Sequence, residues 1–256
     1  MVPLFHKLSK DEFLNPEDTE KYKLGLIYAK KNSTNFYKLI YYTIISIIGF
    51  YVLHDLPYFP KILFGNGDMK EMFRVPYPEC FYLPKPDYFN LYYLGALAFH
   101  VTDLIWLLGV YELQSDFVMM LVHHICTISL ITFSYLVNYF HGGSIILFLH
   151  DFGDIFSYIA RLSMNTSAPE WSKLATGILV LSVWIYTRIF CLAQVIWEIY
   201  LGLSTHWTIV NRILITLQIF LYILHCFWVY MIFKKILDAV FSKKYSDTFK
   251  IKNKEK

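Results

Sequence analysis

Charged residues are scarce in this chain of 256 residues. Asp, Glu, Lys and Arg make up only 17% of it, and hydrophobic residues make up 56%. An average soluble domain has about 25% charged residues, so this composition excludes an ordinary water-soluble domain. The eleven glycines and nine prolines lie mostly between long apolar runs. The hydrophobic excess is therefore segmental, which indicates membrane spans joined by loops.

Cysteine is also scarce and shows no CxxC spacing. Three of the four cysteines fall inside apolar runs, where a thiol behaves as a small hydrophobic group; the four are Cys80, Cys126, Cys191 and Cys226. This pattern predicts neither a disulfide framework nor a zinc site. The first residues, MVPLFHKLSKDEFLNPEDTEKYK, are charged and lack the apolar region of a cleavable secretory signal. We therefore expect the first span to direct the chain to its membrane.

Six apolar stretches have lengths near the ~20 residues that cross a bilayer. They cover residues 36–53, 88–111, 117–137, 142–162, 174–200 and 213–236. The fourth carries a histidine and two aspartates, but its other residues are almost all apolar, and the charge pattern requires a crossing there. We predict an all-α integral membrane protein with six transmembrane helices. The N-terminal segment would be residues 1–35, the six-span domain 36–236, and a basic tail 237–256.

Lysines flank both ends of the spanning region, which predicts that both termini are cytosolic. An even number of spans agrees with this. The loop 54–87 would then be lumenal, and the sequons at Asn32 and Asn165 would stay cytosolic and bare. The last residues, KNKEK, fit the KxKxx pattern of a retrieval tail. Such a tail is an address read by receptors, and here it favours the endoplasmic reticulum membrane.

Ionisable side chains gather in the third and fourth predicted spans. An ionisable group in a helix centre costs ~2.5–3.5 kcal/mol on insertion scales, so it is normally paired, buried or used in function. Helical spacing places His150, Asp151 and Asp154 on one flank of the fourth span. The adjacent His123 and His124 diverge by ~100°, so at most one of them faces that flank directly. His123 lies ~10 Å from the cytosolic start of its helix, within reach of a water-soluble reagent.

These residues occur in a recognisable order. The stretch DFVMMLVHHICTISLITFSYLVNYFHGGSIILFLHDFGDI resembles the signature of the TLC-domain ceramide synthases, with an HH pair, an SY…N segment and an LHDxxD element. Further similarity lies in KKNSTNFYKLIYY, in VPYPECFYLPKPDYFNLYYL, in the TR pair at residues 187–188 and in LHCFWVYMI. Three family positions differ: His141 replaces an Arg, Tyr158 replaces a Glu, and a proline is missing after the TR pair.

The resemblance implies a reaction and a set of roles. Ceramide synthases transfer a fatty acyl group from acyl-CoA to the amine of a sphingoid base. The fold would be six helices around a narrow acyl-chain cavity, with no cofactor beyond acyl-CoA as substrate, no metal and no nucleic-acid partner. Homo- or hetero-oligomers stay open. The implied catalytic residues are His123, His124, His150, Asp151 and Asp154, and the implied substrate-binding residues are Ser134, Tyr135 and Asn138.

Within the catalytic set, His123 or His124 would accept the acyl group, and His150, Asp151 and Asp154 would act as base and orienting groups. A covalent acyl-imidazole and direct attack by the amine both remain open. His100, Asp103 and Arg188 are candidate supporting residues. For each of these three, a structural hydrogen bond or ion pair is the favoured explanation, and for Arg188 the expected partner is a buried carboxylate. His225 and Gln218 are expected to form interhelical hydrogen bonds.

Two other function classes compete with the acyltransferase. Metal-dependent lipid hydroxylases and desaturases also gather histidines near the cytosolic ends of spans, but they typically carry HxxxH and HxxHH boxes, and this sequence has none. A non-catalytic TLC protein that binds or senses lipids is the other alternative. Such relatives often lack the full HH and HDxxD set, which is present here.

Overall fold

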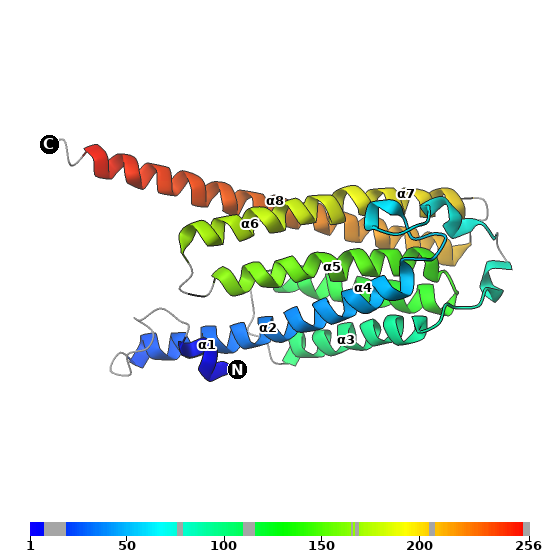
Figure 1. Ribbon diagram of the computed structural model, residues 1–256, viewed down its shortest axis with the longest axis horizontal. Helices are drawn as coiled ribbons and strands as arrows, with labels where there is room; N and C mark the ends of the chain where they lie inside the picture. The colour runs from blue at the N-terminus through cyan, green and yellow to red at the C-terminus, as the bar shows by residue number, and fades with distance from the viewer. Residues whose placement is uncertain are drawn as a thin grey trace. The chain divides into compact units, whose positions relative to one another are not determined.

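The computed structural model describes residues 1–7, 19–75, 79–109, 116–164, 166, 169–204 and 208–252. These residues contain no β-strand beyond one isolated bridge, between Pro60 and Gly67. The long helices are α2 (Thr19–Leu53), α3 (Phe89–Gly109), α4 (Phe117–Leu136), α5 (Phe140–Met164), α6 (Glu170–Trp184), α7 (Leu192–Leu203) and α8 (Ile209–Lys252). A short helix α1 (Val2–Lys7) precedes them (Figure 1).

The chain is a multi-pass membrane protein, as predicted. Five helical stretches are long and apolar enough to cross a membrane: residues 22–53, 89–109, 117–136, 170–203 and 209–241. The fourth predicted span, residues 142–162, is α5, whose 25 residues give a length of about 37 Å, enough to cross. It falls below the hydropathy of the others because it carries the predicted site residues. The all-α membrane fold is thus confirmed, with five spans defined by hydropathy and α5 by its length.

One span contains a wide turn. Between α6 and α7 lies the π-helix η5 (Ile185–Cys191), so that α6, η5 and α7 form one continuous helical stretch. Single π-helical turns inside α-helices occur frequently at functional sites. The η5 segment holds the TR pair, and both Thr187 and Arg188 are buried.

The helices divide into two compact units. The first comprises residues 1–42, 153–185 and 227–256, and the second comprises residues 43–152 and 186–226. In the first unit, the ring of Tyr158 on α5 stacks on Tyr42 of α2 with 5.4 Å between centroids. Arg161 lies 5.3 Å from the same ring, a cation–π contact. Trp184 of α6 donates a hydrogen bond to Ser157 Oγ at 2.8 Å, which ties α6 to α5.

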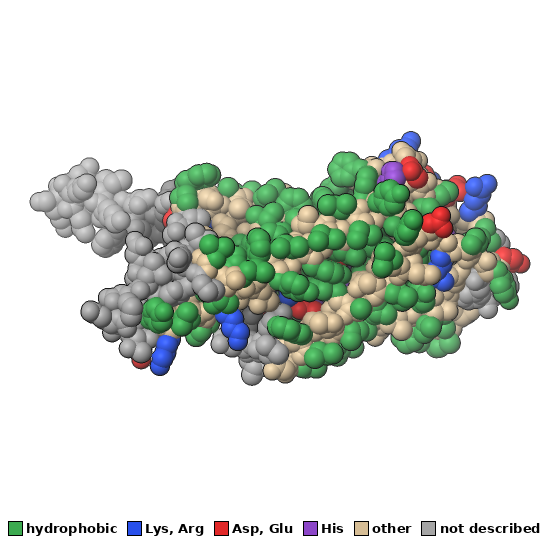
Figure 2. Space-filling view, turned by 60° about the horizontal axis from the view of Figure 1, so that its bottom comes forward, with side chains coloured by type: hydrophobic (Ala, Val, Ile, Leu, Met, Phe, Trp, Pro, Cys, Tyr) green, Lys and Arg blue, Asp and Glu red, His purple; other side chains and the backbone are tan. Residues whose placement is uncertain are grey.

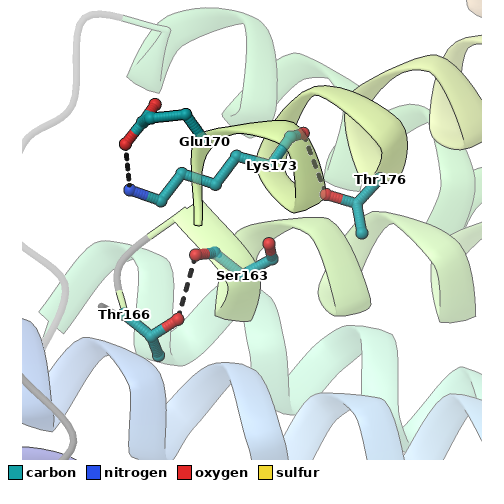
Figure 3. Close-up of polar contacts among 5 residues, drawn as sticks. All are labelled: Ser163, Thr166, Glu170, Lys173 and Thr176. Carbon is teal, nitrogen blue, oxygen red and sulfur yellow. Dashed lines mark hydrogen bonds and ion pairs between the residues drawn. The ribbon is translucent and has the colours of Figure 1, made fainter. Parts of the chain in front are cut away.

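Local hydrogen bonds hold the end of α5 and the start of α6 (Figure 3). Thr166 Oγ1 donates to the Ser163 carbonyl at 3.0 Å, and Lys173 Nζ lies 2.9 Å from Glu170 Oε1. Thr176 Oγ1 donates to the Lys173 carbonyl at 3.0 Å. The sequon asparagine Asn165 lies outside the described residues.

The second unit contains the paired helices α3 and α4, which run side by side. Aromatic rings fill its core, where Phe89 lies 5.0 Å from Tyr93 and 4.8 Å from Phe140, measured between ring centroids. The loop after α2 carries two short 3-10 helices, η2 (Lys61–Leu63) and η3 (Met69–Phe73), and a third, η4 (Glu79–Tyr82), precedes α3. Residue Tyr186 donates to the Ile62 carbonyl at 2.7 Å, which ties this loop to η5.

Tyr58 also fastens this loop, through a contact with α5. Ser144 Oγ donates to the His141 carbonyl at 2.9 Å, so the Tyr58 hydroxyl is the donor in its own 3.5 Å contact with Ser144 Oγ. Burial raises the pKa of the Tyr58 phenol, and the hydrogen bond to Ser144 opposes that rise. The phenol therefore stays protonated and remains available as a donor.

Hydrophobic side chains cover the outside of the helices on the face that Figure 2 shows. Large apolar residues with high exposure occur on every spanning helix, among them Ile47, Leu91, Ile105, Trp197 and Ile223. In water such a surface would cause aggregation, whereas in a bilayer the acyl chains of lipids cover it. The exposed faces are therefore the lipid-facing faces.

We expect Gly67→Ala to destabilise the protein. A Cβ at position 67 would overlap the carbonyl oxygen of Pro57, which is backbone and cannot rotate away. The expected cost is about 1–3 kcal/mol, read as a lower apparent Tm of the detergent-purified protein.

The matched control is Gly95→Ala. A Cβ at the exposed helical Gly95 has no neighbouring atom within 4 Å, and alanine is favoured over glycine in a helix by about 0.5–1 kcal/mol. An equal loss of Tm in both variants would contradict the packing of the 54–75 loop.

Candidate active site

Three histidines from three helices meet inside the second unit, and we call them the histidine cluster: His123 of α4, His150 of α5 and His225 of α8. The ring centroids of His150 and His225 are 4.8 Å apart, those of His123 and His225 are 5.7 Å apart, and those of His123 and His150 are 6.5 Å apart. His150 and His225 are buried, and His123 is half-buried. His123 and His150 are 27 residues apart in the sequence, and His150 and His225 are 75 residues apart, yet the three share one site.

Hydrogen bonds define the protonation pattern of His150. Its Nδ1 lies 2.6 Å from the Ile146 carbonyl oxygen, which can only accept, so Nδ1 carries a proton. Its Nε2 lies 2.8 Å from Nε2 of His225. When both rings are neutral, Nε2 of His150 is the acceptor and Nε2 of His225 is the donor. The remaining lone pair of the two rings is then on Nδ1 of His225.

The second histidine of the HH pair faces another partner. His124 is buried on α4, and its Nε2 lies 3.6 Å from Oδ2 of Asp103 on α3. The His100 ring, also on α3, lies 6.4 Å from the His124 ring between centroids. Because adjacent residues diverge by ~100° on a helix, His123 and His124 present their rings to different neighbours. The structure thus places the supporting candidates His100 and Asp103 beside His124.

Arg188 fastens α5 at the histidine cluster. It is 2% exposed, and its Nη2 donates to the His150 carbonyl oxygen at 2.9 Å. This hydrogen bond goes to a backbone carbonyl, and the pairing of Arg188 with a buried carboxylate stays a prediction. Of the two predicted aspartates, Asp151 is fully buried in the second unit. Asp154 is half-buried one turn farther along α5, in the first unit, and so lies outside the site built here.

An apolar cavity leads away from the histidine cluster within the second unit. The cavity volume is about 30 Å³. Its lining comes mainly from α4, α5 and α8, with one residue of α3; the lining residues are Tyr93, Thr127, Leu130, Ile131, Ser134, Gly143, Ile146, Leu147, His150, Gln218 and Leu221. His150 itself forms part of the wall. The apolar lining therefore suits a hydrocarbon group, and His150 brings the histidine cluster to one end of it.

On α4 and α8, the spacing of the lining residues along the helix shows which histidine lies on the same face as the cavity. On α4 the lining residues follow His123 at the fourth, seventh, eighth and eleventh positions, which is the stripe of one helix face. From His124 the same residues are three, six, seven and ten positions away, a poorer fit. On α8, Gln218 and Leu221 precede His225 by seven and four positions. His123, rather than His124, therefore shares the face of the cavity.

The far end of the cavity is closed by a hydrogen-bonded pair. Ser134 Oγ donates to the Leu130 carbonyl at 2.6 Å, so Tyr93 is the donor in its 2.6 Å contact with Ser134 Oγ. Gly143 of α5 makes this possible, because a Cβ there would overlap the Tyr93 hydroxyl. From His150 to Gly143 the cavity spans about 10 Å along α5.

The predicted substrate-binding residues have different surroundings. Ser134 lines the cavity, whereas the Tyr135 hydroxyl donates to Asn90 Oδ1 at 3.1 Å. Asn138 Nδ2 donates to the Leu83 carbonyl at 3.1 Å, and its φ of 58° is a conformation that asparagine tolerates. Tyr135 thus connects α4 to the start of α3, and Asn138, which follows α4, bonds to the segment before α3. The structure places neither residue in the cavity lining.

Sequence reasoning missed two kinds of site residue. His225 was expected only to form an interhelical hydrogen bond, which it does, but it also belongs to the histidine cluster. Tyr93 and Thr127 were not singled out at all. The helical stripe that follows His123 would have pointed to Thr127, while no local signal marks Tyr93. Within the described part of the chain, no three His, Cys, Asp or Glu side chains are arranged to hold a metal ion.

Fold and site define a polytopic helical membrane protein with a buried histidine cluster beside an apolar cavity. A family model described as the TLC domain matches residues 31–234. The match covers most of the chain, so the protein belongs to the TLC-domain family.

Relatives within this family are ceramide synthases. The human protein ceramide synthase 3 is 26% identical over 227 residues, which cover 85% of this chain and 54% of that protein. Ceramide synthase LOH1 of Arabidopsis thaliana is 25% identical over 93% of this chain and 76% of its own length. Ceramide synthase hyl-2 of Caenorhabditis elegans is 28% identical over 93% of this chain and 72% of its own. The chain thus spans about half the length of the human relative and about three quarters of the other two.

We expect nitrogen NMR of ¹⁵N-histidine-labelled protein to show His150 as the neutral tautomer with its proton on Nδ1, because Nδ1 donates to the Ile146 carbonyl. Substituting His225→Phe should shift the His150 Nε2 resonance, since its hydrogen-bond donor is lost, and leave the Nδ1 resonance nearly unchanged. The loop residue His54 serves as the reference. A His150 ring protonated only on Nε2 would contradict the arrangement.

Proposed function

We propose that this protein is an acyl-CoA-dependent N-acyltransferase that forms an amide between a fatty acyl group and the amine of a sphingoid base, giving ceramide or dihydroceramide. The observation that carries this proposal is the histidine cluster at the end of an apolar cavity. Nucleophile and base can be separate histidines there, and the cavity accepts a hydrocarbon chain. The similarity to ceramide synthases supports the same reaction.

His123 is the acyl-accepting residue in this proposal. It shares the cavity face of α4, so an acyl chain in the cavity presents its carbonyl carbon to this ring. The imidazole attacks the thioester, the carbon–sulfur bond breaks, and the acyl group becomes bonded to a ring nitrogen. The proton of the other ring nitrogen passes to the sulfur, so that coenzyme A leaves as a thiol. Because His123 is about 9 Å from the start of α4, the thiol leaves toward that end of the helix.

The amine of the sphingoid base then attacks the acyl-imidazole. A carbon–nitrogen bond forms to the amine, and the bond between the acyl carbon and the imidazole breaks. The amine must lose one proton and the departing imidazole must gain one. The His150–His225 pair is placed to move it, because the lone pair on His225 Nδ1 can accept a proton. Both atoms and charges balance, and neutral His123 is regenerated.

The remaining polar residues orient this pair of reactions. Asp103 lies beside His124 and would fix its tautomer, which holds the HH segment of α4 in register. Arg188 holds the α5 backbone at His150. For Asp151, which is buried on α5 next to His150, we propose a role in charge balance: it stabilises the positive charge that develops when a histidine accepts a proton. A catalytic role for Asp154 stays a prediction from the HDxxD element.

We further propose that the protein resides in the endoplasmic reticulum membrane with both termini in the cytosol. The lysines that flank the spans support this orientation. Acyl-CoA would then approach from the cytosol, and the sphingoid base from the bilayer. The loop 54–75 would face the lumen.

We expect His123→Ala to lower amide formation at least about hundredfold, since nucleophilic and general acid–base groups contribute about 10²–10⁴-fold. The measurement uses detergent-purified protein with labelled long-chain acyl-CoA and sphinganine, and mass spectrometry of the lipid products. Without the amine, wild-type protein should gain the mass of one acyl group on the peptide that contains residue 123.

His54→Ala is the matched control, because His54 lies in the loop after α2 and bonds to Tyr51 and Asp55 rather than to the cluster. It should retain activity and acyl labelling. If wild-type protein made no amide from any pair of acyl-CoA and sphingoid base, yet retained lipids on purification, the non-catalytic lipid-binding alternative would replace this proposal.

We expect native protein made in cells to carry no N-glycan, since Asn32 is buried on α2 and on the cytosolic side of this topology. Asp68→Thr creates a sequon at the exposed Asn66, and threonine can replace aspartate as a helix cap. This variant should gain one glycan, seen as a mass shift that glycosidase removes. The double variant Asn66→Gln with Asp68→Thr is the control, and a glycan on the unaltered protein would contradict the orientation.

A further inference from the structure

Two polar side chains in the cavity wall lack a hydrogen-bond partner for one of their atoms. Thr127 of α4 and Gln218 of α8 are each 7% exposed, and both line the apolar cavity. Within the described residues, neither Oγ1 of Thr127 nor Oε1 of Gln218 makes a hydrogen bond. Buried polar atoms are almost always paired, so unpaired ones in a cavity wall indicate a ligand group.

The two side chains do not hydrogen-bond to each other either. They lie on different helices that border the same cavity, so a group can sit between them. The threonine hydroxyl donates one hydrogen bond, and the carboxamide oxygen accepts one. A hydroxyl group accepts from Thr127 and donates to Gln218 at the same time, whereas a plain hydrocarbon chain would leave both atoms buried and unpaired.

The position of the pair indicates which part of the ligand carries the hydroxyl. Thr127 follows His123 by one helical turn, and side chains on a helix lean toward its N-terminus, so the threonine leans toward the histidine cluster. If His123 accepts the acyl group, as proposed above, the atoms between Thr127 and Gln218 belong to the first part of the acyl chain. The other walls there, Leu130, Ile146 and Leu147, are apolar.

We propose that Thr127 and Gln218 form a hydroxyl-binding subsite, through which the protein prefers fatty acyl groups that carry a hydroxyl close to the carboxyl end. This specificity rests on the proposed acyltransferase function. It concerns the choice among acyl substrates, and no step of bond formation changes.

A competition assay measures this preference directly. Purified protein receives equal amounts of 2-hydroxypalmitoyl-CoA and palmitoyl-CoA with sphinganine, and mass spectrometry gives the ratio of hydroxylated to plain amide product. Wild-type protein should favour the hydroxylated product roughly five- to tenfold, the range expected for one buried hydrogen-bond pair. Thr127→Val and Gln218→Met should each bring the ratio close to one. Because both substrates compete in one reaction, the ratio cancels any loss of folded protein.

Matched controls use the same side chains outside the cavity. Thr102 of α3 bonds to its own helix, with Oγ1 2.8 Å from the Ala98 carbonyl, so Thr102→Val should keep the wild-type ratio. Gln194 of α7 is half-buried and is not part of the cavity lining, so Gln194→Met should keep it as well. A third arm replaces sphinganine by its 1-deoxy analogue, which tests whether the subsite binds a hydroxyl of the base instead.

A binding assay separates failure of this inference from failure of the proposed function. Free 2-hydroxypalmitic acid should raise the apparent Tm of wild-type protein more than palmitic acid does, and the difference should vanish in Thr127→Val and Gln218→Met. This readout needs no catalysis, so it stands even if no amide forms. The inference is overturned if wild-type protein shows no preference in either assay, if both variants keep the preference, or if the variants alter only the choice between sphinganine and its deoxy analogue.

Discussion

Polar groups inside a bilayer find no water, so every one of them must be satisfied by the protein or by its ligand. The arrangement of the second unit follows this constraint. Nδ1 of His150 bonds to the carbonyl of Ile146, its Nε2 bonds to His225, and Arg188 bonds to its backbone carbonyl. The bonds to His225 and from Arg188 join α5 to α8 and to η5. Polar side chains that would be costly to bury unpaired therefore form the hydrogen bonds that define how the helices pack around the cluster.

The same constraint explains where polar residues lie along the cavity. At one end Nε2 of His150 and Nε2 of His225 share a hydrogen bond, and at the other end Tyr93 donates to Ser134, which donates to the Leu130 carbonyl. Between the ends the wall is apolar except for Thr127 and Gln218. An apolar channel with one reactive end suits a hydrocarbon chain attached to a reactive carbonyl. The proposed function and the proposed subsite therefore rest on the same distribution of paired and unpaired polar atoms.

Sequence reasoning was most successful where one helix decides the outcome. The predicted spans correspond to helices because a length of apolar residues is a local property. Their ends agree less well: α2 begins at Thr19 and α8 continues to Lys252, well outside the predicted spans at 36 and 236. Hydropathy detects the stretch that lipid covers, whereas a helix can continue through polar residues beyond the bilayer. The divergence of His123 and His124 likewise followed from helical geometry alone.

Contacts between residues of different helices could not be predicted in this way. The sequence is sufficient to predict a helical membrane protein with spans in these places, because composition and the period of a helix suffice for that. It also determined the candidate residues, through the spacing of the HH and HDxxD elements on two helices. Only the tertiary structure decided that His225 completes the cluster, that Asp103 lies beside His124, and that Thr127 and Gln218 border one cavity. The physical reason is that these contacts depend on the rotation and crossing of whole helices, which side-chain packing decides.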